Sequence, residues 1–301
     1  MPCTRLRCGV VFLLVLAGLW AASSGVALAA SHDPTCTGSF AAPGVLAGAY
    51  TASVSVEGVC EVDDGPTTVA GSLTVLPGST LIAAYGLNHK TGTGESNLTV
   101  DGNMYVESAG AAILGCVLGD FECLEGNPDL TSFVRIEGDL REHDPLGVVM
   151  HNDFVRGSIT EKGGGGGENC AFPGEGVFTL IDYPNYSDYE ESTVGGSIKV
   201  TGLRSCWLGI AHVSIGGSVT INNDQLTDLD AIEILENNIA RNLSCKKNSH
   251  VWDSDDTEGE GLSGILWPRT PEPNIVGGRR RGECVLASPP VENGEPGPGP
   301  F

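Results

Sequence analysis

The stretch VGGSIKV at residues 194–200 and the stretch IGGSVTI at residues 215–221 decide the fold. In both, two glycines follow an apolar residue, and apolar and polar residues then alternate. Alternation with a period of two is typical of a β-strand with one buried face. A glycine lets the backbone bend sharply or approach a neighbouring segment closely. Each stretch therefore predicts a corner followed by a short strand.

The same frame recurs along most of the chain. It consists of an apolar residue, any residue, glycine, a small polar residue and a second apolar residue, with substitutions in some copies. Arg241 replaces the glycine in one copy, so this position is not fully enclosed in every copy. The copies begin at Val69, Val100, Ile136, Val155, Val194, Ile215, Ile239 and Val276.

The spacing of the copies predicts a β-solenoid. Successive copies lie 31, 36, 19, 39, 21, 24 and 37 residues apart. We interpret the intervals of 19 to 24 residues as single coils and the longer ones as two coils with a degenerate copy between them; the interval of 31 residues fits least well. Coils of a solenoid stack by parallel pairing because none buries its apolar face alone. We expect an all-β, single-domain parallel β-helix, right-handed by default.

The ends of the chain and two insertions set the expected boundaries. Arg5 and Arg7 precede an apolar run at 9–20 and a small-residue ending at 27–30, which is typical of a secretory signal peptide over residues 1–30. The run is shorter than the roughly 20 apolar residues needed to span a bilayer. We therefore expect a secreted, extracellular protein without a membrane anchor. The solenoid is expected over 31–284 with insertions near 110–132 and 161–193, and a disordered tail over 285–301.

Cysteine usage fits export. Cys3 and Cys8 fall in the expected leader, and eight cysteines remain. An even number in an oxidising compartment favours four disulfide bonds, and no CxxC pair suggests a zinc ribbon. Eight cysteines allow 105 connectivities, but in stacked coils sequence neighbours are also neighbours in space. We expect the pairs Cys36 with Cys60, Cys116 with Cys123, Cys170 with Cys206, and Cys245 with Cys284.

Charge excludes several partners. The chain has 38 Asp and Glu against 16 Lys and Arg, a formal net charge of −22. A protein binds nucleic acids or anionic membrane surfaces largely through Lys and Arg, which displace the counterions of the phosphates. Neither is therefore an expected partner. The same charge disfavours an enzyme that acts on an anionic polymer. The cations on or near repeat strands are Arg135, Arg156, Lys199 and Arg204.

The acidic stretch DSDDTEGE at 253–260 is the best metal candidate. Alternating carboxylates bind Ca2+, and Gly259 supplies a turn, but Gly264 stands where an EF-hand loop needs its closing acid. A solvated acidic loop is the favoured alternative. No other cofactor is expected. The weak candidate ligands are Asp253, Asp255, Asp256 and Glu258.

Catalytic signatures are missing from the sequence, which has no GxSxG and no HExxH. The histidines lie in unrelated contexts and are expected to be structural or exposed. The segments at 143–144 and 151–153 lie close together in sequence, and convergence of His143, His151 and Asp153 in a cleft would indicate an enzyme. The catalytic residues are therefore unknown.

Three loop features admit two interpretations each. Tyr183, Tyr186 and Tyr189 either stack on sugar rings or pack on their own loop. The glycine run at 163–167 lacks the Gly-Lys-Ser/Thr ending of a phosphate loop, which favours a flexible loop. Asn residues between 222 and 248 form either tight corners or a carbohydrate-binding face, and we favour corners.

The Gly-Gly-Ser repeats, the segment 236–245 and the segment 274–284 resemble uncharacterised secreted bacterial proteins of actinobacterial type, in which Gly-Gly-Asn or Gly-Gly-Ser units repeat. More distantly, the repeats are similar to bactofilins, which are β-helical scaffold proteins. The resemblance implies a β-solenoid fold and export, and it implies no catalytic residue.

Together these features favour a secreted non-enzymatic structural or interaction module of the extracellular space or cell envelope. The alternative is a carbohydrate-binding or polysaccharide-degrading β-helix protein. A glycan or an envelope component is the expected partner. We expect a monomer or small oligomer, because the net charge opposes end-to-end stacking of copies.

Overall fold

The computed structural model describes residues 33–118, 121–127, 129–228, 231–249, 251–252 and 273–285. Within these ranges the chain forms short strands and one 3-10 turn, η1 (Val177–Leu180), and no α-helix. None of the described segments is a helix long and apolar enough to cross a membrane. The expected signal peptide at 1–30 and the tail from 286 onward lie outside the described residues.

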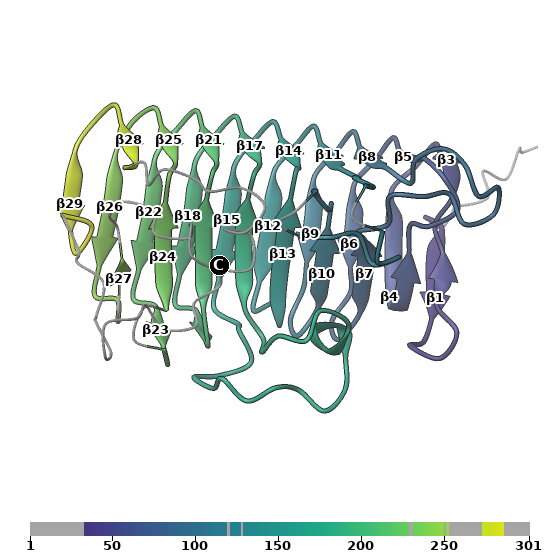
Figure 1. Ribbon diagram of the computed structural model, residues 1–301, viewed down its shortest axis with the longest axis horizontal. Helices are drawn as coiled ribbons and strands as arrows, with labels where there is room; N and C mark the ends of the chain where they lie inside the picture. The colour runs from purple at the N-terminus through teal and green to yellow at the C-terminus, as the bar shows by residue number, and fades with distance from the viewer. Residues whose placement is uncertain are drawn as a thin grey trace, which may run out of the picture. The chain divides into compact units, whose positions relative to one another are not determined.

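The strands stack into a parallel β-helix, as the repeat frame predicts (Figure 1). The coils have three sides. Each coil contributes one strand to each side in turn. In one coil, for example, β17 (Thr193–Val194) is followed by β18 (Ile198–Thr201) and β20 (Leu208–Ala211), and each of these strands pairs in parallel with its counterpart in the next coil. The sides are called sheets 1, 2 and 3 below.

Sheet 1 follows the glycine corners and shows the expected alternation of buried and exposed residues. Val54–Glu61 forms a strand that bends at Gly58 and also joins sheet 2. The strands of sheet 1 are β1 (Thr35–Gly38), β4 (Val54–Glu61), β6 (Leu73–Val75), β9 (Met104–Val106), β12 (Leu140–His143), β15 (Ile159–Lys162), β18 (Ile198–Thr201), β22 (Val219–Asn222), β26 (Leu243–Lys246) and β29 (Arg280–Gly282).

Sheet 2 differs from sheet 1 because the residues on both faces of its middle strands are buried. Between sheets 1 and 2, β19 (Arg204–Ser205) pairs with β23 (Gln225–Leu226). Besides the second half of β4, the strands of sheet 2 are β2 (Gly44–Val45), β7 (Thr80–Ala83), β10 (Ala111–Leu114), β13 (Gly147–His151), β16 (Ser187–Glu190), β20 (Leu208–Ala211), β24 (Ile232–Leu235) and β27 (Val251–Trp252).

Sheet 3 contains the first residues of all the repeat copies. From Val69 to Val276 each of these residues is the direct cross-strand partner of the next, so the alignment derived from the sequence is confirmed. The strands are β3 (Gly48–Tyr50), β5 (Thr67–Val69), β8 (Leu98–Val100), β11 (Val134–Ile136), β14 (Phe154–Val155), β17 (Thr193–Val194), β21 (Ser214–Ile215), β25 (Asn238–Ile239) and β28 (Ile275–Val276).

The interpretation of the long intervals as two coils is wrong. Val155 and Val194 are 39 residues apart, yet they pair directly as neighbours in sheet 3. Each long interval is therefore a single coil that carries an insertion. A parallel stack tolerates this because an insertion leaves at a corner and returns to the same register, and longer loops add little closure entropy.

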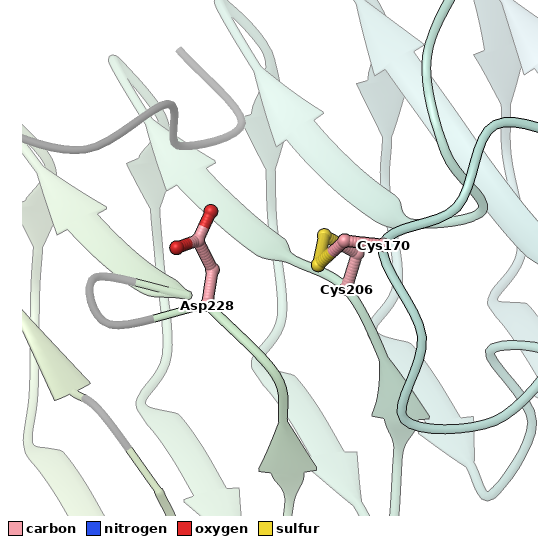
Figure 2. Close-up of side chains that lie close together, drawn as sticks. All are labelled: Cys170, Cys206 and Asp228. Atoms are coloured by element: carbon pink, nitrogen blue, oxygen red, sulfur yellow. A yellow bond between two sulfur atoms is a disulfide. The ribbon is translucent and has the colours of Figure 1, made fainter.

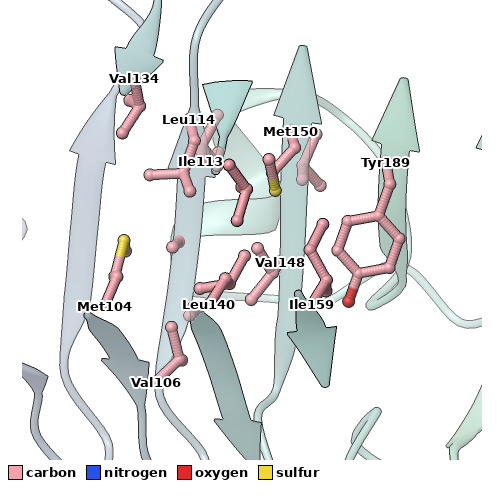
Figure 3. Packing of buried hydrophobic residues seen from close by; sticks show 14 of the residues in the cluster. Met104, Val106, Ile113, Leu114, Val134, Leu140, Val148, Met150, Ile159 and Tyr189 are labelled. Atoms are coloured by element: carbon pink, nitrogen blue, oxygen red, sulfur yellow. The ribbon is translucent and has the colours of Figure 1, made fainter. Parts of the chain in front are cut away.

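Inside the coils, aliphatic side chains from the three sheets fill the core. Figure 3 shows Met104, Leu140 and Ile159 from sheet 1 facing Val148 from sheet 2. These four side chains are fully buried. Because neighbouring coils place similar residues in register, the core is continuous along the stack, and each coil buries the apolar face of the next.

The glycine corners have a steric cause. A β-carbon on Gly196 would lie 2.6 Å from the carbonyl oxygen of Gly157, and one on Gly217 would lie 2.6 Å from that of Gly196. These two corners thus stack too closely for a side chain that points as a β-carbon on either glycine would, whereas Arg241 stands in the same column one coil later and is exposed. The five glycines at 163–167 lie between Val155 and Val194, and each has a positive φ. The backbone N–H of Gly165 donates to the carbonyl of Pro145. The expectation of a flexible loop is therefore wrong there, since this run is hydrogen-bonded to neighbouring coils.

All four expected disulfides are present: Cys36–Cys60, Cys116–Cys123, Cys170–Cys206 and Cys245–Cys284. The first and last lie in the first and last described coils, where they link strands to the stack. The second closes the loop that the sequence predicts near 110–132.

Candidate functional site

The outer face of sheet 2 carries polar side chains that are nevertheless buried. On β16, Ser187 and Tyr189 point into the core, whereas Asp188 and Glu190 point outward. Asp188 is 1% exposed and Glu190 is 6% exposed. Burying a carboxylate is unfavourable unless a partner compensates for the lost hydration, so these acids indicate a specific arrangement.

His151 is the first partner of these acids. It ends β13 and stands directly opposite Glu190 in the register. Its Nδ1 atom lies 3.4 Å from Oε2 of Glu190 and 3.0 Å from Oε2 of Glu191, and its Nε2 atom lies 3.3 Å from Oδ2 of Asp188. Both ring nitrogens of one buried imidazole therefore face carboxylates.

His212 approaches the same two glutamates from the next coil. Its Nδ1 atom lies 3.3 Å from Oε1 of Glu190 and 3.9 Å from Oε1 of Glu191. Its Nε2 atom lies 3.1 Å from Oε2 of Glu236. The two glutamates thus lie between two imidazoles. We call the set His151, Asp188, Glu190, Glu191, His212 and Glu236 the His–Glu cluster.

The backbone places these residues at one corner of the solenoid. Asn152, Glu191, His212 and Glu236 each follow a strand of sheet 2, and each has a positive φ between 45° and 61°. This left-handed conformation is uncommon for residues other than glycine. Four successive coils adopt it at the same position, so side chains distant in sequence are stacked at that corner.

Electrostatics favour a charged imidazole at the centre. Burial opposes protonation of His151, but hydrogen bonding to Asp188 and Glu191 and the charge of Glu190 outweigh it, so the pKa of His151 is raised well above its usual value. Burial also raises the pKa of Asp188, against the opposing effect of His151. The ring of Phe121 stacks on His151 with centroids 4.2 Å apart and shields it from water.

A second buried acidic group lies inside the core. Glu142 and Glu161 are cross-strand neighbours on the inner face of sheet 1. Oη of Tyr189 lies 2.8 Å from Glu142 and 3.1 Å from Glu161, and Ser187 donates to Glu161. Burial raises the pKa of Glu161 to about 8 and that of Glu142 well above its usual value. At least one carboxyl is therefore protonated at neutral pH, which lets the tyrosine donate to one and accept from the other.

The convergence of His143, His151 and Asp153 does not occur. His143 is exposed on the outer face of sheet 1, beside Asp144. Asp153 is buried at the corner after His151 and accepts a hydrogen bond from the backbone of Val134. The sequence therefore identified His151 but not its partners, which come from other coils.

A three-residue group that resembles a metal site has another explanation. Cys170, Cys206 and Asp228 lie close together (Figure 2), but the two cysteines form a disulfide. They offer no thiolate to an ion. Asp228 accepts a hydrogen bond from Nε1 of Trp207 at 2.8 Å.

The three tyrosines divide between core and loop. Tyr189 is a core residue on β16 (Figure 3), so placing it on a loop was wrong. Tyr186 is buried against Phe178, Tyr183 and Trp207. Tyr183 is 41% exposed. The interpretation that loop aromatics pack together is thus correct for Tyr186.

Most of the expected surface cations are engaged. Arg135 pairs with Glu137 and lies over the ring of Phe154, and Arg156 pairs with the same glutamate. Arg204 lies 3.4 Å from Glu168. Lys199 is exposed on sheet 1. The expected calcium ligands at 253–260 lie outside the described residues.

Asn237 and Asn248 serve the corners, as we expected. Asn237 is buried, accepts from the backbone of Val213 and donates to the carbonyl of Ile210. Asn248 likewise accepts from the backbone of Asp224 and donates to Ile221. These side chains bridge backbone groups of successive coils and are not presented to a ligand.

Sequence reasoning missed Glu190, Glu191, His212 and Glu236. A signal was available, because the last three of these stand three positions before the first residue of consecutive repeat copies. Comparison with known proteins adds no function: no family model, no curated protein and no solved structure matches this chain.

Proposed function

We propose that this protein is a secreted, non-enzymatic interaction module of the extracellular space or cell envelope, and that the outer face of sheet 1 binds an anionic glycan. Four disulfides support an oxidising compartment. The observation that carries the proposal is a group of exposed cations on this face.

Lys162 on β15, Lys199 on β18 and Lys246 on β26 project outward and are exposed. Within the described ranges, no carboxylate lies within ion-pair distance of these three side chains. Residues with hydroxyl or amide groups stand between them in the same registers and suit the hydroxyls of a sugar. They are Thr160, Thr201, Thr220, Asn222 and Ser244.

The spacing suits a polymer that lies along the stack. Lys162 and Lys246 share one register column and are three strands apart, which corresponds to about 14 Å at roughly 4.8 Å per strand. The net charge of the chain is negative, yet the Debye length is about 8 Å at physiological salt. A ligand on sheet 1 therefore responds mainly to these lysines and less to the acids of sheet 2.

The test is binding of polygalacturonate, with neutral dextran as the comparison ligand, to immobilised protein over a range of NaCl concentrations. We expect polygalacturonate to bind, to weaken as salt increases, and to lose at least tenfold in affinity in the variant Lys162→Gln/Lys199→Gln/Lys246→Gln. The matched control is Arg156→Gln, which removes an exposed cation that already pairs with Glu137.

Equal binding of dextran, or unchanged affinity in the triple variant, would refute the glycan surface. The alternative of a polysaccharide-degrading solenoid draws support from the His–Glu cluster, whose imidazoles and carboxylates are groups that transfer protons. It predicts new reducing ends when the polymer is incubated with the protein. We expect none, and their appearance would replace the proposal by this alternative.

A further inference from the structure

We propose that the protein cuts its own chain at the peptide bond between Asp144 and Pro145, with the carboxyl group of Asp144 as the nucleophile. The two residues lie at the corner between β12 and β13. The side chain of Asp144 is 52% exposed and is therefore free to turn toward its own backbone carbonyl. This activity does not depend on the glycan surface of sheet 1.

An Asp–Pro sequence contains the groups that this reaction needs. The carboxylic acid of Asp144 attacks the carbonyl carbon of the same residue, a five-membered cyclic anhydride forms, and the C–N bond to Pro145 breaks. The proton of the acid moves to the proline nitrogen, which leaves as a secondary amine. Water then opens the anhydride. One chain ends at Asp144, the other begins at Pro145, and one water molecule is consumed.

Neighbouring groups are placed to assist this attack. The backbone N–H of Ala109 donates to the carbonyl oxygen of Asp144 at 2.7 Å. Negative charge develops on this oxygen during the attack, so a fixed donor stabilises the transition state. Nδ1 of His143 lies 3.6 Å from Oδ2 of Asp144. An imidazole exchanges protons near neutral pH and therefore helps to supply the acid form of the carboxyl.

The backbone is strained at the bond that breaks. Asp144 has a φ of 50°, whereas a residue before proline normally adopts an extended conformation. The corresponding corners of the next three coils also have a positive φ, and none of their residues precedes a proline: Gly163, Gly202 and Asn223. Strain that is stored in the intact chain and released by cleavage lowers the barrier to the reaction.

The glycine run of the next coil holds this bond from both sides. The N–H of Asp144 donates to the carbonyl of Lys162, and the carbonyl of Pro145 accepts from Gly165. A β-carbon on Gly163 would collide with Oδ1 of Asp144, and one on Gly164 would lie 2.6 Å from the nitrogen of Pro145. The glycines thus let the backbone pack directly on the reacting groups and restrict their movement.

Cleavage leaves two chains that stay together in the fold. Two of the four disulfides lie before the bond and two lie after it, so none of them links the products. Across the cut, β12 pairs with β15 and β10 pairs with β13. Denaturation therefore separates the products without reduction of any of these disulfides.

The test is incubation of the purified full-length protein in neutral buffer at physiological temperature, followed over days by mass spectrometry after denaturation. We expect increasing amounts of a fragment that ends at Asp144 and of one that begins at Pro145. The bond between Asp33 and Pro34 is the internal comparison, because it has the same chemistry in an exposed segment. It should break at least about tenfold more slowly, since no neighbouring coil positions it.

Two variants separate the roles of the reacting groups. Asp144→Gly tolerates the positive φ but has no carboxyl, and Pro145→Ala keeps the carboxyl but replaces the proline nitrogen. Each should slow cleavage at least about tenfold. Asn223→Gly is the matched control, because it makes the same kind of change at a corresponding corner with a φ of 59°. It should be cut at the rate of the unaltered protein.

Circular dichroism of each variant verifies that it is folded. An unaltered protein that stays intact would overturn the proposal. So would an unchanged rate in both Asp144→Gly and Pro145→Ala, which would indicate a contaminating protease, or equal rates at the two Asp–Pro bonds.

Discussion

The two sides of β16 handle buried acids in opposite ways. Inward, Ser187 and Tyr189 meet Glu142 and Glu161, and no cation is among their hydrogen-bond partners. Outward, Asp188 and Glu190 meet the imidazoles of His151 and His212. The inner acids become neutral by taking up a proton, whereas the outer acids gain positively charged partners.

The difference shows what determines whether a buried carboxyl is protonated or ionised in this fold. The core offers only hydroxyl groups, which stabilise a charge too little to offset lost hydration, so the pKa of Glu161 rises to about 8. The corner beside sheet 2 stacks residues from successive coils and can accumulate imidazoles. Acids inside the coils are therefore paired with hydroxyl groups and protonated, whereas acids outside are paired with imidazoles.

The largest expected effect tests the inner side. Tyr189→Ala removes a fully buried ring and the hydroxyl shared by two carboxyls. We expect a loss of about 3–5 kcal/mol in the free energy of unfolding, because a cavity forms and the carboxyls lose a partner. Chemical denaturation measures it. Tyr189→Phe keeps the ring and should lose only about 1–3 kcal/mol; equal losses in the two variants would contradict a role for the hydroxyl.

The second effect is a pH dependence. A carboxyl with a raised pKa in the folded state contributes stability that is fully present below its unfolded pKa and is lost as pH rises toward the folded value. For Glu161 that window runs from about 4.5 to about 8. We expect the free energy of unfolding to fall by a few kcal/mol between pH 5 and pH 8.

Glu161→Gln should flatten this dependence, because the amide carries no charge and still accepts a hydrogen bond from Ser187. Denaturation curves at several pH values for both proteins provide the measurement. A variant with the same pH slope as the unaltered protein would show that the inner carboxyls are ionised in the folded state, and the contrast between the two sides would fail.

The smallest effect tests the outer side. Phe121→Leu removes the ring that stacks on His151 but retains apolar cover. We expect a loss of about 1 kcal/mol in the free energy of unfolding, because the imidazole keeps its carboxylate partners. Thermal and chemical denaturation would show it. A loss as large as that of Tyr189→Ala would mean that the cover, and not the ion pairs, holds the outer acids in place.

The sequence predicted more of the fold than of the site. Alternation and the glycine frame identified the residues that pair through sheet 3, from Val69 to Val276, and predicted all four disulfides. The interpretation of each long interval as two coils was wrong, because no local sequence feature distinguishes a degenerate coil from an inserted loop. The sequence identified His151 as a candidate but paired it with His143, which the strand places on another side of the solenoid.

By itself, the sequence determined the strand period, the corners and the order of the coils, because these follow from local backbone preferences and from which residues are apolar. Tertiary structure alone decided that His151, Glu190 and His212 meet, since the length of each insertion does not reveal which coils are neighbours. It also decided that outward acids on sheet 2 are buried while outward lysines on sheet 1 are exposed. The outward residues of β16 on sheet 2 and of β18 on sheet 1 are polar in both cases, and only the neighbouring segments determine which of these faces water reaches.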